Sequence, residues 1–208
     1  MDIHAIARQC FTGARASHDW DHTRRVLKLC ERIGPVEQAD MDVLKVGALL
    51  HDIGRVHQDA ARGAVCHAVH GAVLAEPIVA GLAFSSERKD NILHCIRTHR
   101  FRGHHIPKTI EAKVLFDADK LDAIGAIGIA RAYLFAGEIG ARLHSPDLDP
   151  EKSASYSIDD TGFREYRVKL RKIKDRMMTS EGKRMADERH QFMTEFFNRF
   201  LQEYEGEV

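Results

Sequence analysis

A histidine and an aspartate stand next to each other at the end of an apolar run, and this pair is the strongest chemical feature of the sequence. His51 and Asp52 follow the apolar segment 43–50 and precede Gly54, a residue type common just beyond a helix C-terminus. A helix over that segment would carry both side chains into the interior, where polar groups without partners cost free energy. A divalent cation would satisfy them, because imidazole and carboxylate are ligands of Mn, Fe, Ni, Zn and Mg. The pair predicts a metal site if other helices supply further ligands.

A second histidine lies on the apolar side of the preceding predicted helix. His22 comes four residues before Val26 and seven before Leu29, so it shares their buried stripe. Gly34-Pro35 is expected to close this helix. A single histidine on such a stripe is usually a core residue bonded to a backbone carbonyl, but the nearby His-Asp pair favours a ligand.

More histidines follow the pair. The spacing predicts a helix over 65–81, which Pro77 should kink or split. His70 precedes two apolar residues by three and four positions, so we expect it to face the core, and His67 could share that side. In the next predicted helix His99 lies on the apolar stripe.

Three carboxylates interrupt the apolar helix that is predicted to begin near Thr109. Burying them is costly unless some are used. Asp119 and Asp122 are three residues apart and lie on one side of that helix, whereas Asp117 points nearly the opposite way. All three compete for the role of a further metal ligand.

The rest of the chain is also helical in pattern, and no strand alternation of useful length occurs. A polar loop is expected at 57–63 and an irregular stretch at 143–161. Helical spacing returns over 163–178 and again over 181–204, whose wide aromatic stripe is read first as core and second as a homodimer surface. The fold class is therefore all-α.

Composition narrows the function further. The 208 residues suggest one domain, and 44% hydrophobic with 30% charged residues are ordinary for a soluble protein. The formal net charge is zero, so we expect neither a nucleic acid nor a membrane as a partner. The four cysteines form no C-x-x-C pair, and the chain shows neither a signal peptide pattern nor a membrane-spanning run, so we expect a cytoplasmic protein.

Taken together, these features resemble the HD superfamily of metal-dependent phosphohydrolases, whose ligand pattern is His…His-Asp…Asp. The resemblance is carried by six segments that span nearly the whole chain: 17–26, 48–54, 70–72, 96–101, 117–128 and 178–189. It implies one HD-type domain over 1–208, built as a helical bundle with a metal-binding core (1–142), a loop (143–162) and C-terminal helices that pack on the core (163–208).

The resemblance also implies the ligands. The four positions that match the family's metal ligands are His22, His51, Asp52 and Asp119. Asp119 is chosen among the three competing carboxylates because the family's last ligand typically precedes a basic and then an apolar residue. Lys120-Leu121 meets that pattern.

Further roles are carried over or inferred. Lys120 matches a position that contacts the substrate phosphate, and His70 and His99 match positions that line the pocket. We expect His70 to protonate the leaving group and Asp52, beside the metal, to orient the attacking water. Lys120, with Arg55 or His99, is expected to contact the phosphate and stabilise the charge that develops on it.

Two residues are assigned to substrate binding on our own inference. They are Arg55, just past the metal pair, and Asp122, on the Asp119 side of its helix.

The branch of the family that the segments resemble hydrolyses nucleoside triphosphates and releases pyrophosphate. The expected activity is therefore conversion of a (deoxy)nucleoside triphosphate to its monophosphate with Mn, Mg, Ni, Fe or Zn. Three alternatives stay open: a di-iron HD-type oxygenase, a cyclic-dinucleotide phosphodiesterase (although its Gly-Tyr-Pro motif is absent), and a regulatory module that binds metal and nucleotide without turnover.

Overall fold

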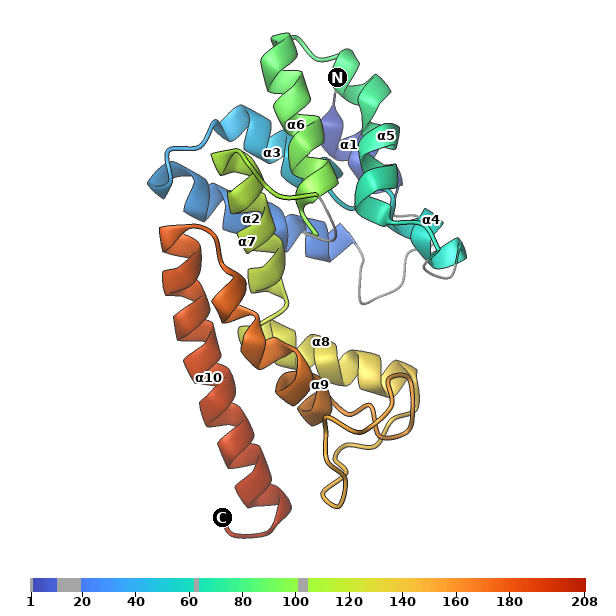
Figure 1. Cartoon of the computed structure of the whole chain (residues 1–208), viewed down its shortest axis with the longest axis vertical. Helices are drawn as coiled ribbons and strands as arrows, with labels where there is room; N and C mark the ends of the chain where they lie inside the picture. Colours follow the sequence, from blue (N-terminus) through green and yellow to red (C-terminus); the bar gives the residue numbers. More distant parts are fainter. Residues whose placement is uncertain (1, 11–19, 62–63, 101–104) are drawn as a thin grey trace. The chain divides into compact units, whose positions relative to one another are not determined.

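The structure is a computed structural model that describes residues 2–10, 20–61, 64–100 and 105–208, with only the backbone of Asp59. Within those ranges every regular element is a helix, which confirms the all-α prediction (Figure 1). Parts of two segments that carry the resemblance, 17–19 and 101, lie outside the described residues. The chain forms two compact units, which we call the N-terminal unit (Met1–Asp119 with Met178–Gly182) and the C-terminal unit (Lys120–Met177 with Lys183–Val208).

The N-terminal unit is built around α3. Its elements are α1 (Ile3–Gln9), α2 (Trp20–Val36), α3 (Met41–Leu50), α4 (Arg55–Ala60), α5 (His67–Ala80), α6 (Ser86–Thr98) and most of α7 (Ile110–Asp122). Helix α3 packs against α2 and α6, and α5 packs against α6. Helix α2 ends at Val36, so its predicted end at Gly34-Pro35 is accurate to within two residues.

Helix α3 forms where the apolar run predicts it. The Asp40 side chain caps its first turn by accepting hydrogen bonds from the backbone N–H groups of Asp42 and Val43. Nearly every residue from Val43 onward is buried, and the helix ends at Leu50 with His51 as its C-cap. The His51-Asp52 pair is thus delivered into the interior, as the sequence predicts.

One local prediction in this unit was wrong and another was wrong in part. The polar loop expected at 57–63 begins with a helix, α4, because Gly54 offers its carbonyl to the Gln58 N–H and starts a new turn. Helix α5 runs through Pro77, which lies on its exposed side near the C-terminus, so the predicted split does not occur, while the predicted kink stays a prediction.

The C-terminal unit consists of short helices and one long one. They are α8 (Gly125–Glu138), α9 (Gly162–Val168), the 3₁₀ turns η2 (Leu170–Lys172) and η3 (Lys174–Arg176), and most of α10 (Ser180–Tyr204). The single helix predicted over 163–178 was wrong, because the backbone leaves helical geometry at Lys169. The two 3₁₀ turns keep Leu170 and Ile173 buried, since residues three apart share a side in such turns.

The stretch 143–161 contains no helix, in agreement with its sequence. Asp160 organises it by accepting hydrogen bonds from the Tyr156 N–H at 2.7 Å and from Arg164 at 2.7 Å.

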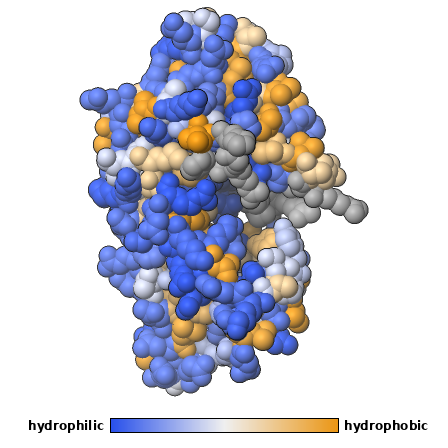
Figure 2. Space-filling view, viewed as in Figure 1, coloured by the Kyte–Doolittle hydropathy of each residue, from blue (hydrophilic) through white to orange (hydrophobic). Residues whose placement is uncertain are grey.

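The aromatic stripe of α10 is mainly core. Met193 and Phe197 are buried, and Phe197 stacks on Tyr166 with ring centroids 4.3 Å apart. Phe192 and Phe196 are partly exposed, while polar residues cover most of the face seen in Figure 2. A homodimer through this stripe stays a prediction. None of the helices in the described ranges is long and apolar enough to span a membrane.

Candidate metal centre

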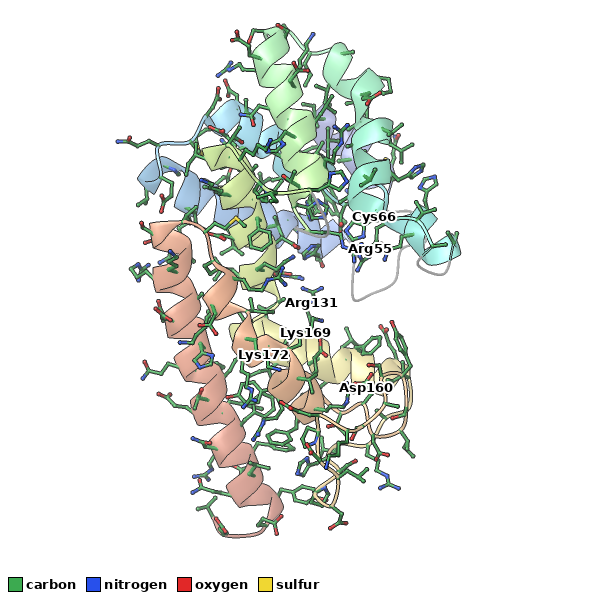
Figure 3. The ribbon with its side chains drawn as sticks, viewed as in Figure 1. Arg55, Cys66, Arg131, Asp160, Lys169 and Lys172 are labelled. Carbon is green, nitrogen blue, oxygen red and sulfur yellow. The ribbon has the colours of Figure 1, made fainter. Side chains whose placement is uncertain are left out.

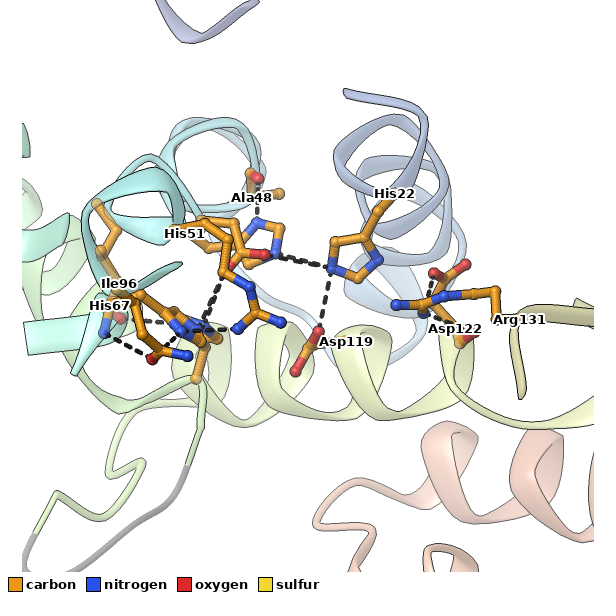
Figure 4. A network of polar contacts seen from close by, with 12 residues as sticks. His22, Ala48, His51, His67, Ile96, Asp119, Asp122 and Arg131 are labelled. Atoms are coloured by element: carbon orange, nitrogen blue, oxygen red, sulfur yellow. Dashed lines mark hydrogen bonds and ion pairs between the residues drawn. The ribbon is translucent and has the colours of Figure 1, made fainter. Parts of the chain in front are cut away.

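The ring of His51 is held in one orientation and one tautomer at the end of α3. Its Nδ1 lies 2.7 Å from the carbonyl oxygen of Ala48 (Figure 4). A carbonyl oxygen can only accept, so Nδ1 carries the hydrogen and Nε2 keeps a bare lone pair. That lone pair points toward Nε2 of His22, 3.3 Å away.

Four side chains from three parts of the N-terminal unit meet at His22. Its Nε2 lies 3.3 Å from Oδ1 of Asp119 and 3.8 Å from Oδ2 of Asp52, in addition to the contact with His51. The predicted quartet is thus gathered in one place, although its members are up to 97 positions apart in the sequence. His22, His51 and Asp52 also satisfy the spacing required of a metal site. This mixed set of imidazole nitrogens and carboxylate oxygens fits a divalent cation.

The protonation states suit metal binding. Burial lowers the pKa of His51 to about 4, although the neighbouring Asp52 opposes that shift. Burial alone would raise the pKa of Asp52, but the adjacent His51 and the contacts with His67 and His99 hold that pKa well below its usual range. At neutral pH His51 is therefore neutral and Asp52 ionised, which are the forms that coordinate cations.

Asp52 also belongs to a second cluster on its other side. Its Oδ1 lies 3.1 Å from Nε2 of His67 and 3.5 Å from Nε2 of His99, and these two nitrogens are 3.1 Å apart. His99 donates its Nδ1–H to the carbonyl of Ile96 at 2.7 Å, so its Nε2 is bare, as in His51. Asp52, His67 and His99 form a second group that could hold a cation.

His67, rather than His70, occupies the place beside Asp52. The buried side of α5 is formed by small residues around Gly71 and Ala72, while Val73 is half exposed. Our sequence prediction took the larger Val73 as the core marker and so turned the helix too far. His70 is only partly buried and its ring lies 4.7 Å from that of His57, outside both clusters.

Close approach of α5 explains why small residues line its buried side. A Cβ at Gly54 would collide with the carbonyl oxygen of His67, and it would lie 2.7 Å from the N–H nitrogen of Gly71. The pair Gly54 and Gly71 was the sequence signal that could have shown which side of α5 is buried. His67 lies on that side, because it comes four residues before Gly71 on the same helix.

Arg55 contacts His67, and two further residues that the sequence did not single out, Gln58 and Arg100, join the same hydrogen-bond network. Its Nη1 lies 2.9 Å from Nδ1 of His67, and Oε1 of Gln58 lies at the same distance from that nitrogen. Arg100 in turn donates to Oε1 of Gln58 at 3.0 Å and approaches Cys66, the residue before α5 that Figure 3 labels beside Arg55. The predicted contact of Arg55 with phosphate stays a prediction.

The remaining predicted residues follow Asp119 in the sequence. Lys120 is its direct neighbour on α7 and stays our predicted phosphate contact. Asp122 is buried and forms an ion pair with Arg131 at 2.9 Å, both within the C-terminal unit. This pairing gives Asp122 a structural role, and its contact with substrate stays a prediction.

Comparison with known proteins agrees with the geometry. Residues 19–124 match the model of the HD domain family. YpgQ of Bacillus subtilis (strain 168), named as an uncharacterized protein, is 32% identical over 98% of this chain and 93% of its own length.

Solved structures agree over the same length. A crystal structure of B. subtilis YpgQ in complex with ADP covers 97% of this chain and 92% of its own, with 30% identity and a TM-score of 0.72. An HD-superfamily hydrolase from Bacillus thuringiensis covers 98% and 95%, with 27% identity and a TM-score of 0.78. The chain belongs to the HD domain family, and these neighbours support a metal-dependent hydrolase.

Proposed function

We propose that this protein is a divalent-metal-dependent phosphohydrolase that converts a nucleoside triphosphate to its monophosphate and pyrophosphate. The observation that carries the proposal is the convergence of His22, His51, Asp52 and Asp119 around one point, with the His51 lone pair directed into it. These four side chains would hold the cation, which would acidify a water molecule and polarise a phosphoryl oxygen.

The chain's own residues supply the acid–base chemistry. Asp52 is ionised and offers one oxygen to each cluster, so it can orient a water molecule for attack in line with the leaving group. His67 takes the place beside the leaving group that we expected for His70, because its Nε2 is the imidazole nitrogen nearest to Asp52 Oδ1. As a neutral ring, His67 could donate a hydrogen bond from Nε2–H to an oxygen of the leaving pyrophosphate. Lys120 would stabilise the negative charge that develops on the phosphate.

Two observations support a nucleotide as the substrate. The resemblance that the sequence carries is to a branch that acts on nucleoside triphosphates, and B. subtilis YpgQ was crystallised with ADP. The release of pyrophosphate, and the identity of the base and metal, belong to the proposal.

A panel of nucleoside mono-, di- and triphosphates with Mn²⁺, Mg²⁺, Ni²⁺ and Fe²⁺ tests the proposal, scored for phosphate against pyrophosphate. We expect pyrophosphate and monophosphate in equal amounts from at least one triphosphate. Asp119→Asn should lower this rate by about 1,000-fold or more and remove bound metal. Asp42→Asn, an exposed carboxylate on α3, is the matched control and should change neither. Full activity of Asp119→Asn, or product formed without metal, would contradict the proposal.

The second cluster favours one alternative, an oxygenase with two irons. Such a site needs histidines beyond the quartet, and His67 and His99 lie on the far side of Asp52. Two equivalents of iron per chain, magnetic coupling between them and consumption of O₂ would establish this activity. Hydrolysis with a single metal ion and no O₂ uptake would exclude it.

The cytoplasmic location stays a prediction from the sequence.

A further inference from the structure

Asp117 is a fully buried carboxylate that takes no part in the metal clusters. It lies on α7 two residues before Asp119, and at about 100° per residue the two side chains leave the helix on nearly opposite sides. Burial of a carboxylate is tolerated only when donors satisfy its oxygens.

The donors come from a segment that returns to the N-terminal unit and begins 61 residues later. The N–H of Met178 lies 2.9 Å from Oδ1, while the N–H and the hydroxyl of Thr179 lie 2.8 and 2.7 Å from Oδ2. The Thr179 hydroxyl oxygen also accepts a hydrogen bond from the Gly182 N–H at 3.0 Å, and so it caps the start of α10. Asp117 therefore joins α7 to the first turn of α10.

The fit between the two segments is close. A Cβ at Gly182 would collide with Oδ2 of Asp117 and lie 2.7 Å from the Thr179 hydroxyl. The residue before Gly182 is also fixed: the Glu181 N–H donates a hydrogen bond at 2.7 Å to the carboxylate of Glu37, which directly follows α2. The segment Met178–Gly182 is thus fixed both to α7 and beside the C-terminus of α2, the helix that carries His22.

The other end of α7 is fixed separately. Glu111 accepts hydrogen bonds from the Asp40 N–H at 2.8 Å and from the Asn91 side chain at 2.9 Å. Glu111 and Asp117 hold α7 at two points, so the helix cannot rotate about its axis without breaking one set of bonds.

Rotation matters because metal ligation has a narrow tolerance. A carboxylate on a helix lies roughly 5 Å from the axis, so turning α7 by about 10° would move Asp119 by about 1 Å. Ligand distances are constrained to about 0.2 Å.

We propose that Asp117, with Thr179 and Gly182, is a positioning site that sets the orientation of Asp119 for cation binding. This inference rests on the proposed function, in which Asp119 is a metal ligand.

Asp117→Asn tests the positioning site. The new amide places N–H donors against the donors of Met178 or Thr179, so α7 should shift at that point. We expect Mn²⁺ to bind about 10- to 100-fold more weakly by calorimetry, the range typical of outer partners of metal ligands. Hydrolysis should fall at low Mn²⁺ and recover at high Mn²⁺, with KM for the nucleotide unchanged.

Thr179 provides a milder pair of variants in case Asp117→Asn does not fold. Thr179→Val removes the hydroxyl and should weaken Mn²⁺ binding in the same direction, whereas Thr179→Ser should restore it. Thr194→Val is the matched control, because Thr194 is a half-buried threonine within α10. Its hydroxyl bonds to the carbonyl of His190 and to the hydroxyl of Tyr166, all within the C-terminal unit. It should leave Mn²⁺ affinity unchanged.

The outcomes separate the two proposals. Wild-type protein that binds none of Mn²⁺, Mg²⁺, Ni²⁺ and Fe²⁺ would refute the proposed function itself. Wild-type protein that binds Mn²⁺, with unchanged affinity in folded Asp117→Asn and in Thr179→Val, would overturn only the positioning site, even if both variants melt at lower temperature.

Discussion

Histidines are buried in both units of the molecule, but their surroundings differ completely. In the N-terminal unit His51 and His99 each donate Nδ1–H to a backbone carbonyl and turn a bare Nε2 toward carboxylates and other imidazoles. In the C-terminal unit His144 lies among aromatic rings, with Phe163 and Tyr204 each 4.9 Å from it, and its buried Nδ1 has no hydrogen-bond partner. Burial alone therefore does not mark a functional histidine. The feature that we take to distinguish a proposed metal ligand is a fixed tautomer that directs a lone pair toward carboxylates and other imidazoles.

The largest difference in activity should appear between two phenylalanine variants, one at His51 in the N-terminal unit and one at His144 in the C-terminal unit. His51→Phe removes a ligand and should lower hydrolysis by about 1,000-fold or more with loss of bound metal. His144→Phe replaces a ring whose buried Nδ1 has no partner with an apolar ring in an aromatic environment, so activity should stay within about twofold and thermal stability should be equal or higher. Circular dichroism should accompany both assays, and His51→Asn repeats the first test with a smaller side chain. A silent His51 variant would erase the contrast between the units.

A smaller effect is expected between the two histidines of α5. His67→Gln removes the imidazole beside Asp52 and should lower kcat by about 100-fold, the loss typical of one hydrogen-bond donor to developing negative charge. His70→Gln affects a ring outside both clusters and should change kcat by less than about threefold. Steady-state kinetics at saturating metal distinguishes them. The opposite ranking would return the catalytic role to His70.

The metal-free protein should lose stability as the pH falls from about 6.5 to about 4. Burial lowers the pKa values of His51 and His67 to about 4, so these rings stay neutral in the folded chain while they protonate in the unfolded chain. The unfolded state binds more protons in that window, and stability therefore decreases as pH decreases. Thermal unfolding in EDTA at several pH values measures this loss, and His67→Gln should make the dependence shallower. A melting temperature that is constant over this range would show that these rings are not buried and neutral.

The sequence allowed much of this arrangement to be predicted, for identifiable reasons. The apolar run before His51 and the two helical turns that separate His22 from Leu29 are local patterns, and local patterns determine which side of a helix is buried. The choice of Asp119 over its neighbours came from the family resemblance. In the structure Asp119 lies at His22 while Asp117 bonds to the start of α10.

Other features depend on contacts between distant segments and could not be predicted in this way. One such feature is the buried side of α5. Gly54 approaches Gly71 closely, so the small residues of α5 face inward and Val73 faces outward. The partners of Asp117 lie 61 and 62 residues away, and no periodicity within α7 reveals them. The end of α9 at Lys169 likewise shows in the backbone but not in the apolar spacing.

The most direct test of the account is a crystal structure of the protein grown with Mn²⁺, with anomalous diffraction recorded at the manganese edge. We expect an anomalous peak within bonding distance, about 2.0 to 2.3 Å, of His22, His51, Asp52 and Asp119. A peak that none of these side chains touches, or no peak in protein that hydrolyses a nucleotide in the same solution, would contradict it.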